Sequence, residues 1–112
     1  MELYAEYIKE REGKECLFNE HSFIIYKIYE DEISVIDIYT SPEKREGFSL
    51  KSLVKDFYKI AKHNKIKRLY GFTDPETVGW KRSENMMLKY GFEKIKTEDS
   101  GYNHYVLNLE GK

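Results

Sequence analysis

Apolar residues recur at helical spacing in three segments of the chain. The strongest stripe runs through residues 49–63 and consists of Leu50, Leu53, Val54, Phe57, Ile60 and Ala61. A second stripe runs through residues 79–90 and consists of Trp80, Ser83, Met87 and Tyr90. Residues 2–12 carry a weaker one. The i, i+3, i+4, i+7 spacing predicts three amphipathic helices, of which Gly13 ends the first and Gly91 the last.

Segments rich in Ile, Val, Tyr and Phe predict five strands, at residues 22–30, 33–40, 66–73, 92–97 and 102–109. The acidic turn between the first two is so short that these strands should be antiparallel. We expect this pair beside the third strand, with the two longer helices packed on the sheet. The order α-β-β-α-β-α-β-β predicts an α+β protein with a mixed, mostly antiparallel sheet flanked by helices.

Composition places the chain among small globular proteins. Its 112 residues are 40% apolar and 35% charged, which predicts one domain, residues 1–112, with a core of its own. A single cysteine, Cys16, cannot form an internal disulfide, and no apolar run reaches membrane-spanning length. The first residues lack the basic start of a signal peptide. These features predict a cytoplasmic protein without a membrane partner.

The net charge of −1 conceals an uneven distribution of charged residues. Residues 1–43 hold 4 Lys and Arg against 11 Asp and Glu, whereas residues 44–96 hold 14 against 6. A basic second half suits a polyphosphate ligand or a nucleic acid. We interpret the lysines that repeat along residues 49–63 as a solvated helix face. For Lys44 and Arg45, which lie in a loop, we expect a ligand-binding role.

The strand at residues 33–40 leads into the strongest helix through a short basic loop. Ser41-Pro42 ends the strand, residues 43–48 form the loop, and the helix begins near Ser49. The backbone N–H groups of such a glycine-containing loop and the positive end of a helix dipole both attract anions. This unit therefore predicts a site for phosphate groups.

Several segments resemble those of one family in the same order and at similar spacing. They are residues 36–39 before Pro42-Glu43, residues 69–75, Gly79, Ser83 and residues 88–92. On these segments the chain resembles the GNAT superfamily of acyl-CoA-dependent N-acyltransferases, most of all its small phage-encoded members. The resemblance implies a GNAT-like fold, acetyl-CoA as the acyl donor and an amine as the acceptor. It also implies a truncated N-terminal part, reduced to one helix, residues 2–12, and a short link. The acceptor is therefore not identified, because the family's acceptor pocket is formed there.

The phosphate loop of the family follows the pattern Q/R-x-x-G-x-G/A, from which this chain departs. In one alignment the loop consists of Lys44, Arg45, Glu46, Gly47, Phe48 and Ser49, which keeps the first glycine. In the other, which starts at Arg45, Phe48 and Leu50 stand where small residues belong. We favour the first, because small residues let the backbone approach a pyrophosphate closely. The second would indicate a fold that has lost its cofactor.

The resemblance also implies roles for the strand that precedes the loop. The backbone of Ile38, Tyr39 and Thr40 corresponds to the part that holds the acyl thioester. Family members deprotonate the amine with a carboxylate, often through water, before it attacks the thioester directly. Asp37 is our candidate for this base, because it interrupts an apolar strand and shares, by the two-residue period, a face with Val35 and Tyr39. The alternative is an exposed structural aspartate.

The tyrosine with which many family members protonate the departing thiolate corresponds here to Met87. Ser83 or solvent would have to replace it, and we include Ser83 among the cofactor-binding residues. A CoA thiolate is a good leaving group, so the loss of one acid need not abolish transfer.

The remaining candidates carry less information. The three histidines, at positions 21, 63 and 104, are too scattered for a metal motif, and we expect no metal. We interpret His104 as a packed or edge histidine. Three functional hypotheses follow: an acetyl-CoA-dependent N-acetyltransferase, a non-catalytic GNAT-fold protein such as a phage virion or host-interaction component, and a nucleic-acid-binding module, which we disfavour. The resemblance also allows a homodimer.

Overall fold

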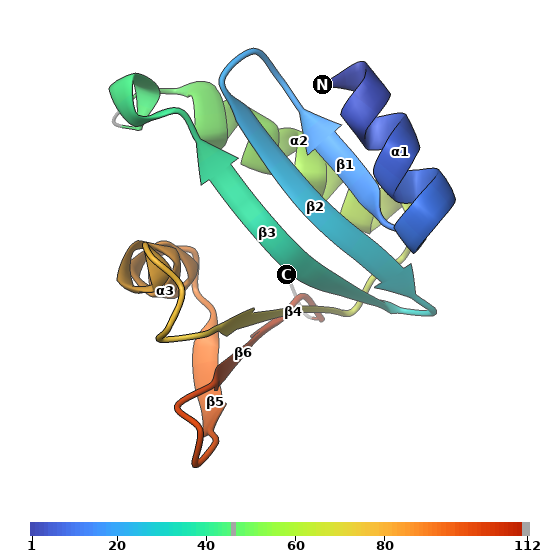
Figure 1. The fold of residues 1–112 in the computed structure, drawn as a ribbon. Coiled ribbons are helices and arrows are strands. Elements are labelled where there is room, and N and C mark those ends of the chain that lie inside the picture. Colours follow the sequence, from blue (N-terminus) through green and yellow to red (C-terminus); the bar gives the residue numbers. More distant parts are fainter. Residues whose placement is uncertain (46, 111–112) are drawn as a thin grey trace.

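The structure, a computed structural model, describes residues 1–45 and 47–110. In chain order its elements are α1 (Glu2–Glu12), β1 (Glu15–Phe18), β2 (Ser22–Tyr29), β3 (Glu32–Thr40), the short 3₁₀ helix η1 (Pro42–Lys44), α2 (Ser49–His63), β4 (Arg68–Thr73), α3 (Trp80–Lys89), β5 (Glu93–Thr97) and β6 (Asn103–Asn108) (Figure 1). Within these described ranges, no helix combines the length and the apolar character needed to cross a membrane.

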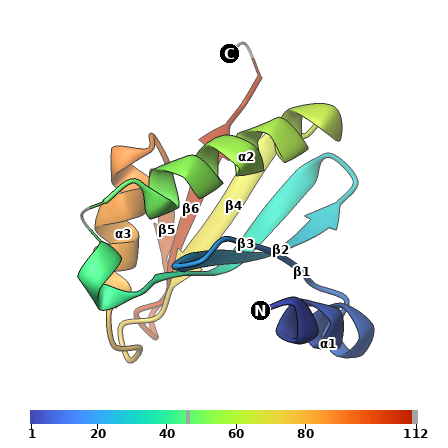
Figure 2. The ribbon, with the colours of Figure 1, turned by 90° about the horizontal axis from the view of Figure 1, so that it is seen from above.

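The six strands form one mixed sheet in the order β1-β2-β3-β4-β6-β5. Among the strands of the described residues, β3 and β4 are parallel neighbours and the other neighbouring pairs are antiparallel. Helix α1 lies on one face of the sheet and α2 on the other (Figure 2). Helix α3 contacts β4 and β5, and its Met87 side chain reaches Gly71 of β4. This architecture confirms the predicted α+β fold, including the antiparallel pair beside the strand β4.

The main core lies between the sheet and α2. The stripe predicted on residues 49–63 is the face that α2 buries, through Leu53, Phe57 and Ala61. The ring of Phe57 meets that of Tyr26 on β2 edge-on, with the centroids 5.2 Å apart. Burying a large apolar side chain contributes about 1.5–3 kcal/mol. Packing at Leu53, Phe57 and Ala61 therefore fixes α2 against the sheet.

The link after α1 contains a strand that the sequence analysis did not predict. Strand β1 pairs antiparallel with β2, and each of its four residues is half-buried. Four residues without a buried and exposed alternation give no period that could be recognised in the sequence. The N-terminal part thus consists of a helix and an edge strand, and the expected plain link is wrong. Gly13 does end α1, in the left-handed conformation with φ 67°.

Strands β3 and β4 are paired only where they begin. The ladder joins Glu32 to Arg68, Ile33 to Leu69 and Ser34 to Tyr70, and stops there. Beyond this point the two strands diverge (Figure 1). Residues 35–40 of β3 therefore have no strand partner from β4. The sheet opens there into a wedge, whose β3 side leads to η1 and the N-terminus of α2.

Candidate functional site

A small apolar cavity lies beside the wedge, between the sheet and its two covering helices. Its volume is about 40 Å³. Its lining comes from β2, β3, α2, β4, α3 and the residue before β5, and consists of Ile24, Val35, Ile38, Val54, Phe57, Tyr58, Leu69, Met86, Met87, Tyr90 and Phe92. Among the residues predicted to bind the cofactor, Ile38 lines this cavity. The cavity extends the wedge on the side of α2 and α3.

The loop after β3 is attached to the end of that strand by Arg45. The Arg45 Nε donates a 3.0 Å hydrogen bond to the carbonyl oxygen of Thr40, and its guanidinium lies 5.5 Å from the centre of the Tyr39 ring. The Thr40 hydroxyl is buried and hydrogen-bonded to Ser22. Three predicted cofactor-binding residues are therefore in mutual contact. Glu46, also predicted, lies outside the described residues.

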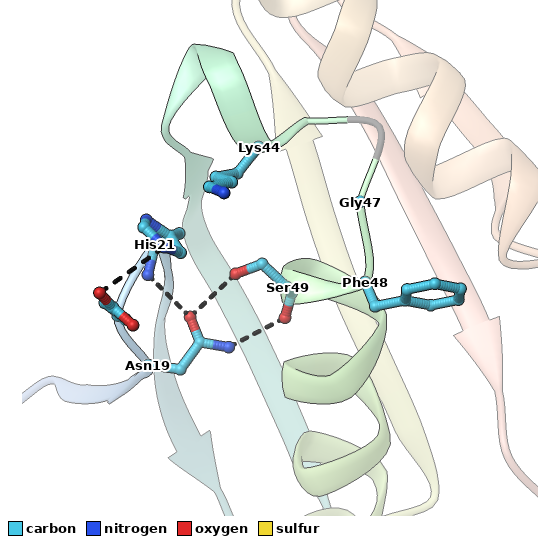
Figure 3. Close-up of a pocket in the computed structure, with 7 residues that line it drawn as sticks. Asn19, His21, Lys44, Gly47, Phe48 and Ser49 are labelled. Carbon is cyan, nitrogen blue, oxygen red and sulfur yellow. Dashed lines mark hydrogen bonds and ion pairs between the residues drawn. The ribbon is translucent and has the colours of Figure 1, made fainter.

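The N-terminus of α2 has no described side chain to cap it. Phe48 occupies the N-cap position, and no acidic residue lies in the first turn. The first N–H groups of a helix have no partner inside the helix, so they present partial positive charge. Phe48 is 79% exposed, and its ring points away from Lys44 and Ser49 (Figure 3). The ring therefore does not fill the inside of the loop, although the sequence pattern places Phe48 where a small residue belongs.

An open pocket lies between this loop and the turn that joins β1 and β2. It has a volume of about 410 Å³ and is lined by Asn19, Glu20, His21, Lys44, Gly47, Phe48 and Ser49. Asn19 anchors the wall, because its Oδ1 accepts from the Ser49 hydroxyl at 3.0 Å and its Nδ2 donates to the Ser49 carbonyl at 2.9 Å (Figure 3). The exposed Lys44 points toward His21 across the opening (Figure 3). The Ser49 hydroxyl is thus held by the protein itself.

Asp37 lies on the face of β3 opposite to the core. The pairing with β2 shifts between Ile25 and Tyr26, so that Asp37 lies opposite Ile25 and Val35 opposite Tyr26. This β-bulge puts Val35 and Ile38 on the core side and leaves Asp37 exposed on the other. The prediction that Asp37 shares a face with Val35 is therefore wrong, because the strand does not keep a strict two-residue period. Desolvation raises the pKa of Asp37, and the backbone N–H of Ile38 partly offsets the rise.

Helix α3 buries a charged residue that sequence analysis did not find. Glu84 is 4% exposed and accepts hydrogen bonds from Lys94 at 2.7 Å and from the fully buried hydroxyl of Tyr105. Hydrogen bonds from Lys94 and Tyr105 lower the pKa of Glu84 to about 2, and burial raises the pKa of Tyr105 to about 12. A glutamate within a helix gives no signal of burial, so the sequence pattern could not have shown this network.

The two predicted positions of α3 lie differently with respect to the wedge: Met87 lines the apolar cavity beside it, and Ser83 does not. Met87 is buried, and its sulfur lies over Gly71, where an added Cβ would come within 2.5 Å of it. Ser83 is half-buried beside Glu84 and does not line the apolar cavity. In residues 1–45 and 47–110, no cluster of His, Cys, Asp and Glu could hold a metal ion.

Solved structures with the same arrangement are acetyltransferases of one class. The PaiA N-acetyltransferase from Thermoplasma acidophilum, in complex with coenzyme A, matches with a TM-score of 0.68 at 19% identity, over 80% of this chain and 54% of that one. A GNAT family acetyltransferase from Elizabethkingia anophelis with acetyl-CoA bound matches with a TM-score of 0.67 at 17% identity. That match covers 96% of this chain and 82% of the other. A protein from Desulfovibrio desulfuricans assigned to the GNAT acetyltransferases matches with a TM-score of 0.78 at 15% identity. That match covers 96% of this chain and 76% of the other.

These matches define the fold of the chain. It has the GNAT fold, as the resemblance in the sequence implied. The chain spans about half the length of the PaiA structure, 54%. No protein-family model and no curated protein matches the sequence. The likeness, at 15–19% identity, is one of fold, and the activity has to be argued from the site.

Proposed function

We propose that the protein is an N-acetyltransferase, which moves an acetyl group from acetyl-CoA to an amine by direct attack. The observation that carries this proposal is the wedge between β3 and β4, which ends beside an uncapped helix N-terminus. Acetyl-CoA carries its thioester on a long arm that ends in a pyrophosphate, and a binding site for it has to accommodate both parts. The arm needs an open strand edge, and the phosphates need N–H groups.

The strand side of the wedge offers hydrogen-bonding groups to a ligand. The backbone of Ile38, Tyr39 and Thr40 belongs to the stretch of β3 that β4 does not pair. The next residue, Ser41, has a buried hydroxyl with no hydrogen-bond partner among the described residues. A buried polar atom without a partner costs about 1–3 kcal/mol, so a ligand that satisfies it gains affinity. We assign the thioester end of acetyl-CoA to this stretch.

The loop offers positive charge and a close approach to the backbone. Lys44 is exposed and makes no ion pair among the described residues. An added Cβ on Gly47 would meet only the Lys44 carbonyl oxygen, at an ordinary 3.5 Å, so the fold itself does not require glycine there. We assign the pyrophosphate to Lys44, Gly47 and the first N–H groups of α2. Arg45 shapes the loop, and Phe48 offers an exposed ring beside it.

The acceptor amine is assigned to the opposite face of the sheet, where Asp37 lies exposed. The raised pKa of Asp37 makes its carboxylate a better proton acceptor than an ordinary aspartate. Asp37 takes the proton of the amine through a water, and the neutral amine then attacks the thioester carbon. The collapse of the resulting intermediate breaks the carbon–sulfur bond and releases the CoA thiolate.

A second candidate is a GNAT-fold protein without catalytic activity, such as a virion or host-interaction component. Two observations favour it: the buried Met87 fills a position where the family offers an acid, and the apolar cavity of about 40 Å³ is far below the roughly 300 Å³ of small ligand pockets. In this case the wedge would be the remnant of a cofactor site that no longer binds acetyl-CoA.

Release of free CoA thiol from acetyl-CoA distinguishes the two candidates. We expect amine-dependent thiol release by the wild-type protein, measured with a disulfide reagent against a panel of lysine peptides, polyamines and hydroxylamine. Thiol release that equals the protein-free rate with every amine, together with absent acetyl-CoA binding, would support the non-catalytic candidate.

A further inference from the structure

Two pairs of stacked aromatic rings lie on the sheet face opposite to α2 and α3. Phe23 of β2 and Tyr39 of β3 are register partners, and their ring centroids are 5.6 Å apart. Phe72 of β4 and Tyr102 in the turn before β6 have nearly parallel rings, with an interplanar angle of 7° and centroids 5.7 Å apart. Each of these four residues is exposed or half-buried, so both pairs present apolar ring surface to solvent.

The neighbours of Phe72 determine the face on which its ring lies. An added Cβ on Gly71 would meet a side chain of α3, and the Thr73 hydroxyl is hydrogen-bonded to that of Tyr105, which contacts α3 in turn. Because side chains alternate along a strand, the Phe72 ring lies on the other face, together with Asp37. Figure 2 shows α1 on this face beside β1 and β2, so none of the described helices covers β4 there.

Phe72 and Asp37 lie on opposite walls of the wedge. The pairing of β3 with β4 ends at Ser34 and Tyr70, and Phe72 is two residues, about 7 Å, beyond it. Asp37 is three residues beyond it on β3, where the β-bulge takes up one residue, so the two side chains lie at a similar depth. At the apex, Tyr70 is hydrogen-bonded to Nδ1 of His104, which joins β4 to β6 behind the opening.

We propose that the acceptor is a small aralkylamine, a single amine on a short spacer that ends in an aromatic ring. Its ring lies against Phe72 and Tyr102, and its nitrogen lies at Asp37 on the opposite wall. This inference rests on the proposed acetyltransferase function and names the acceptor class for it. Paired strands are about 4.8 Å apart and the wedge is wider, so a spacer of about two to three atoms connects the two positions.

The geometry of the Phe72–Tyr102 pair favours an aromatic group over an alkyl chain. Aromatic rings prefer offset-stacked or edge-to-face neighbours, with centroids about 4.5–7 Å apart. The two rings already form such a stack, at 5.7 Å, so a third ring extends it without rearranging the pair. An alkyl chain covers the same apolar surface but has no ring face to stack. The pair therefore discriminates between amines of similar apolar bulk.

The charges at the opening favour a single amine over a polyamine. Asp37 is exposed and forms no ion pair among the described residues. The Arg45 guanidinium already lies 5.5 Å from the centre of the Tyr39 ring, so a second ammonium group would meet a like charge there. Glu98, a further carboxylate, is engaged by Nε2 of His104 at 2.6 Å. The face therefore offers one free carboxylate to one amine.

A peptide acceptor fits this site less well than a free small amine. An extended peptide needs backbone partners at a free strand edge, and the unpaired edge of β3 is assigned to the arm of acetyl-CoA. A lysine side chain that reached Asp37 would bring an alkyl chain, not a ring, to Phe72.

The acceptor preference is measured as thiol release from acetyl-CoA with 2-phenylethylamine, n-hexylamine and a lysine peptide. We expect kcat/KM to be about tenfold higher for phenylethylamine than for hexylamine, because only the former has a ring to stack. Phe72→Leu should bring the ratio of the two close to one, since leucine stays apolar but has no ring face. The control Tyr29→Leu removes an exposed ring of β2 that pairs with Glu32 outside the wedge, and should keep the ratio.

The possible outcomes separate this inference from the proposed function. Turnover without a preference for phenylethylamine, a higher kcat/KM for the lysine peptide, or an unchanged ratio in Phe72→Leu would overturn the inference and leave the proposed function standing. If Phe72→Leu does not fold, as judged by its thermal midpoint, Tyr102→Leu replaces it with the same expectation. If acetyl-CoA does not bind to the wild type, the proposed function fails and this inference fails with it.

A second measurement does not depend on turnover. In the complex of the protein with CoA and phenylethylamine, the ring protons of the amine should show nuclear Overhauser effects to Phe72 and Tyr102. Such effects to Phe23 and Tyr39 alone would place the ring at the other aromatic pair and overturn the assignment.

Discussion

Arg45 holds the carbonyl oxygen of Thr40 through its Nε, at 3.0 Å, although five residues of strand end and loop separate them. The same guanidinium lies over the ring of Tyr39. Its neighbour Lys44 points instead toward His21 across the open pocket beside the loop (Figure 3). Two adjacent basic residues, which the sequence presents as one phosphate-binding pair, therefore have different roles.

Replacing Arg45 should change the conformation of the loop, because its side chain contacts Thr40 and Tyr39. Because the side chain is exposed, we expect Arg45→Ala to cost only about 0.5 kcal/mol of unfolding free energy. Arg45→Lys should not restore the wild-type loop, since lysine lacks the planar fork that stacks on Tyr39. Urea unfolding and the amide shifts of residues 39–45 measure both effects. Amide shifts in Arg45→Ala that match the wild type would show that Arg45 does not shape the loop.

Gly47 tests whether the loop backbone approaches a ligand. Gly47→Ala should leave the thermal midpoint unchanged, because the added Cβ meets one atom at an ordinary distance. It should weaken acetyl-CoA binding at least tenfold if the pyrophosphate lies against this backbone. Equal affinity of Gly47→Ala and wild type would move the phosphates away from Gly47.

Glu84 should make stability depend on acidic pH. Its pKa is about 2 in the folded protein and 4.5 in an ordinary glutamate, so the folded state gains stability above pH 4.5 and loses it as the pH falls toward 2. The loss should be about 3 kcal/mol relative to Glu84→Gln. Urea unfolding of both proteins from pH 7 to pH 2 measures it, with the exposed Glu93→Gln as control. Parallel stability curves for wild type and Glu84→Gln would contradict the assignment.

Asp37 should affect turnover only with acceptor amines that are charged ammonium ions at the assay pH. With a lysine peptide at pH 7, Asp37→Asn should lower turnover by about 10²-fold, whereas hydroxylamine should react at the wild-type rate. The raised pKa of Asp37 means that the wild-type rate falls as the pH drops through that value, because the carboxylate becomes protonated. Asp56→Asn, on the exposed side of α2, is the matched control. Equal losses with both acceptors would assign Asp37 a structural role.

The sequence predicted the fold well because its longest patterns are the ones that form the core. The stripe on residues 49–63 became the buried face of α2, and the two hairpins followed from short turns. Strand β1 was missed because four half-buried residues have no period. In both cases the length of the hydrophobic pattern decided whether the element could be predicted.

The candidate site was less accessible to prediction, because its geometry depends on irregular features. The bulge at Ile36 reverses the face on which Asp37 lies, and one extra residue leaves no mark in the hydrophobic pattern. The contact between Tyr70 and His104 joins residues 34 positions apart, and only the pairing of β4 with β6 brings them together. Single-sequence reasoning gives the strands but not their register.

The binding of acetyl-CoA at the loop decides between a working acetyltransferase and a remnant of one. Isothermal titration of the wild-type protein should give saturable binding of one acetyl-CoA per chain. Lys44→Ala should weaken it about tenfold, because one charged phosphate contact contributes about 1–3 kcal/mol. Lys59→Ala, an exposed lysine farther along α2, should bind like the wild type. No heat of binding to the wild type, or equal affinity in Lys44→Ala and Lys59→Ala, would contradict a phosphate site at this loop.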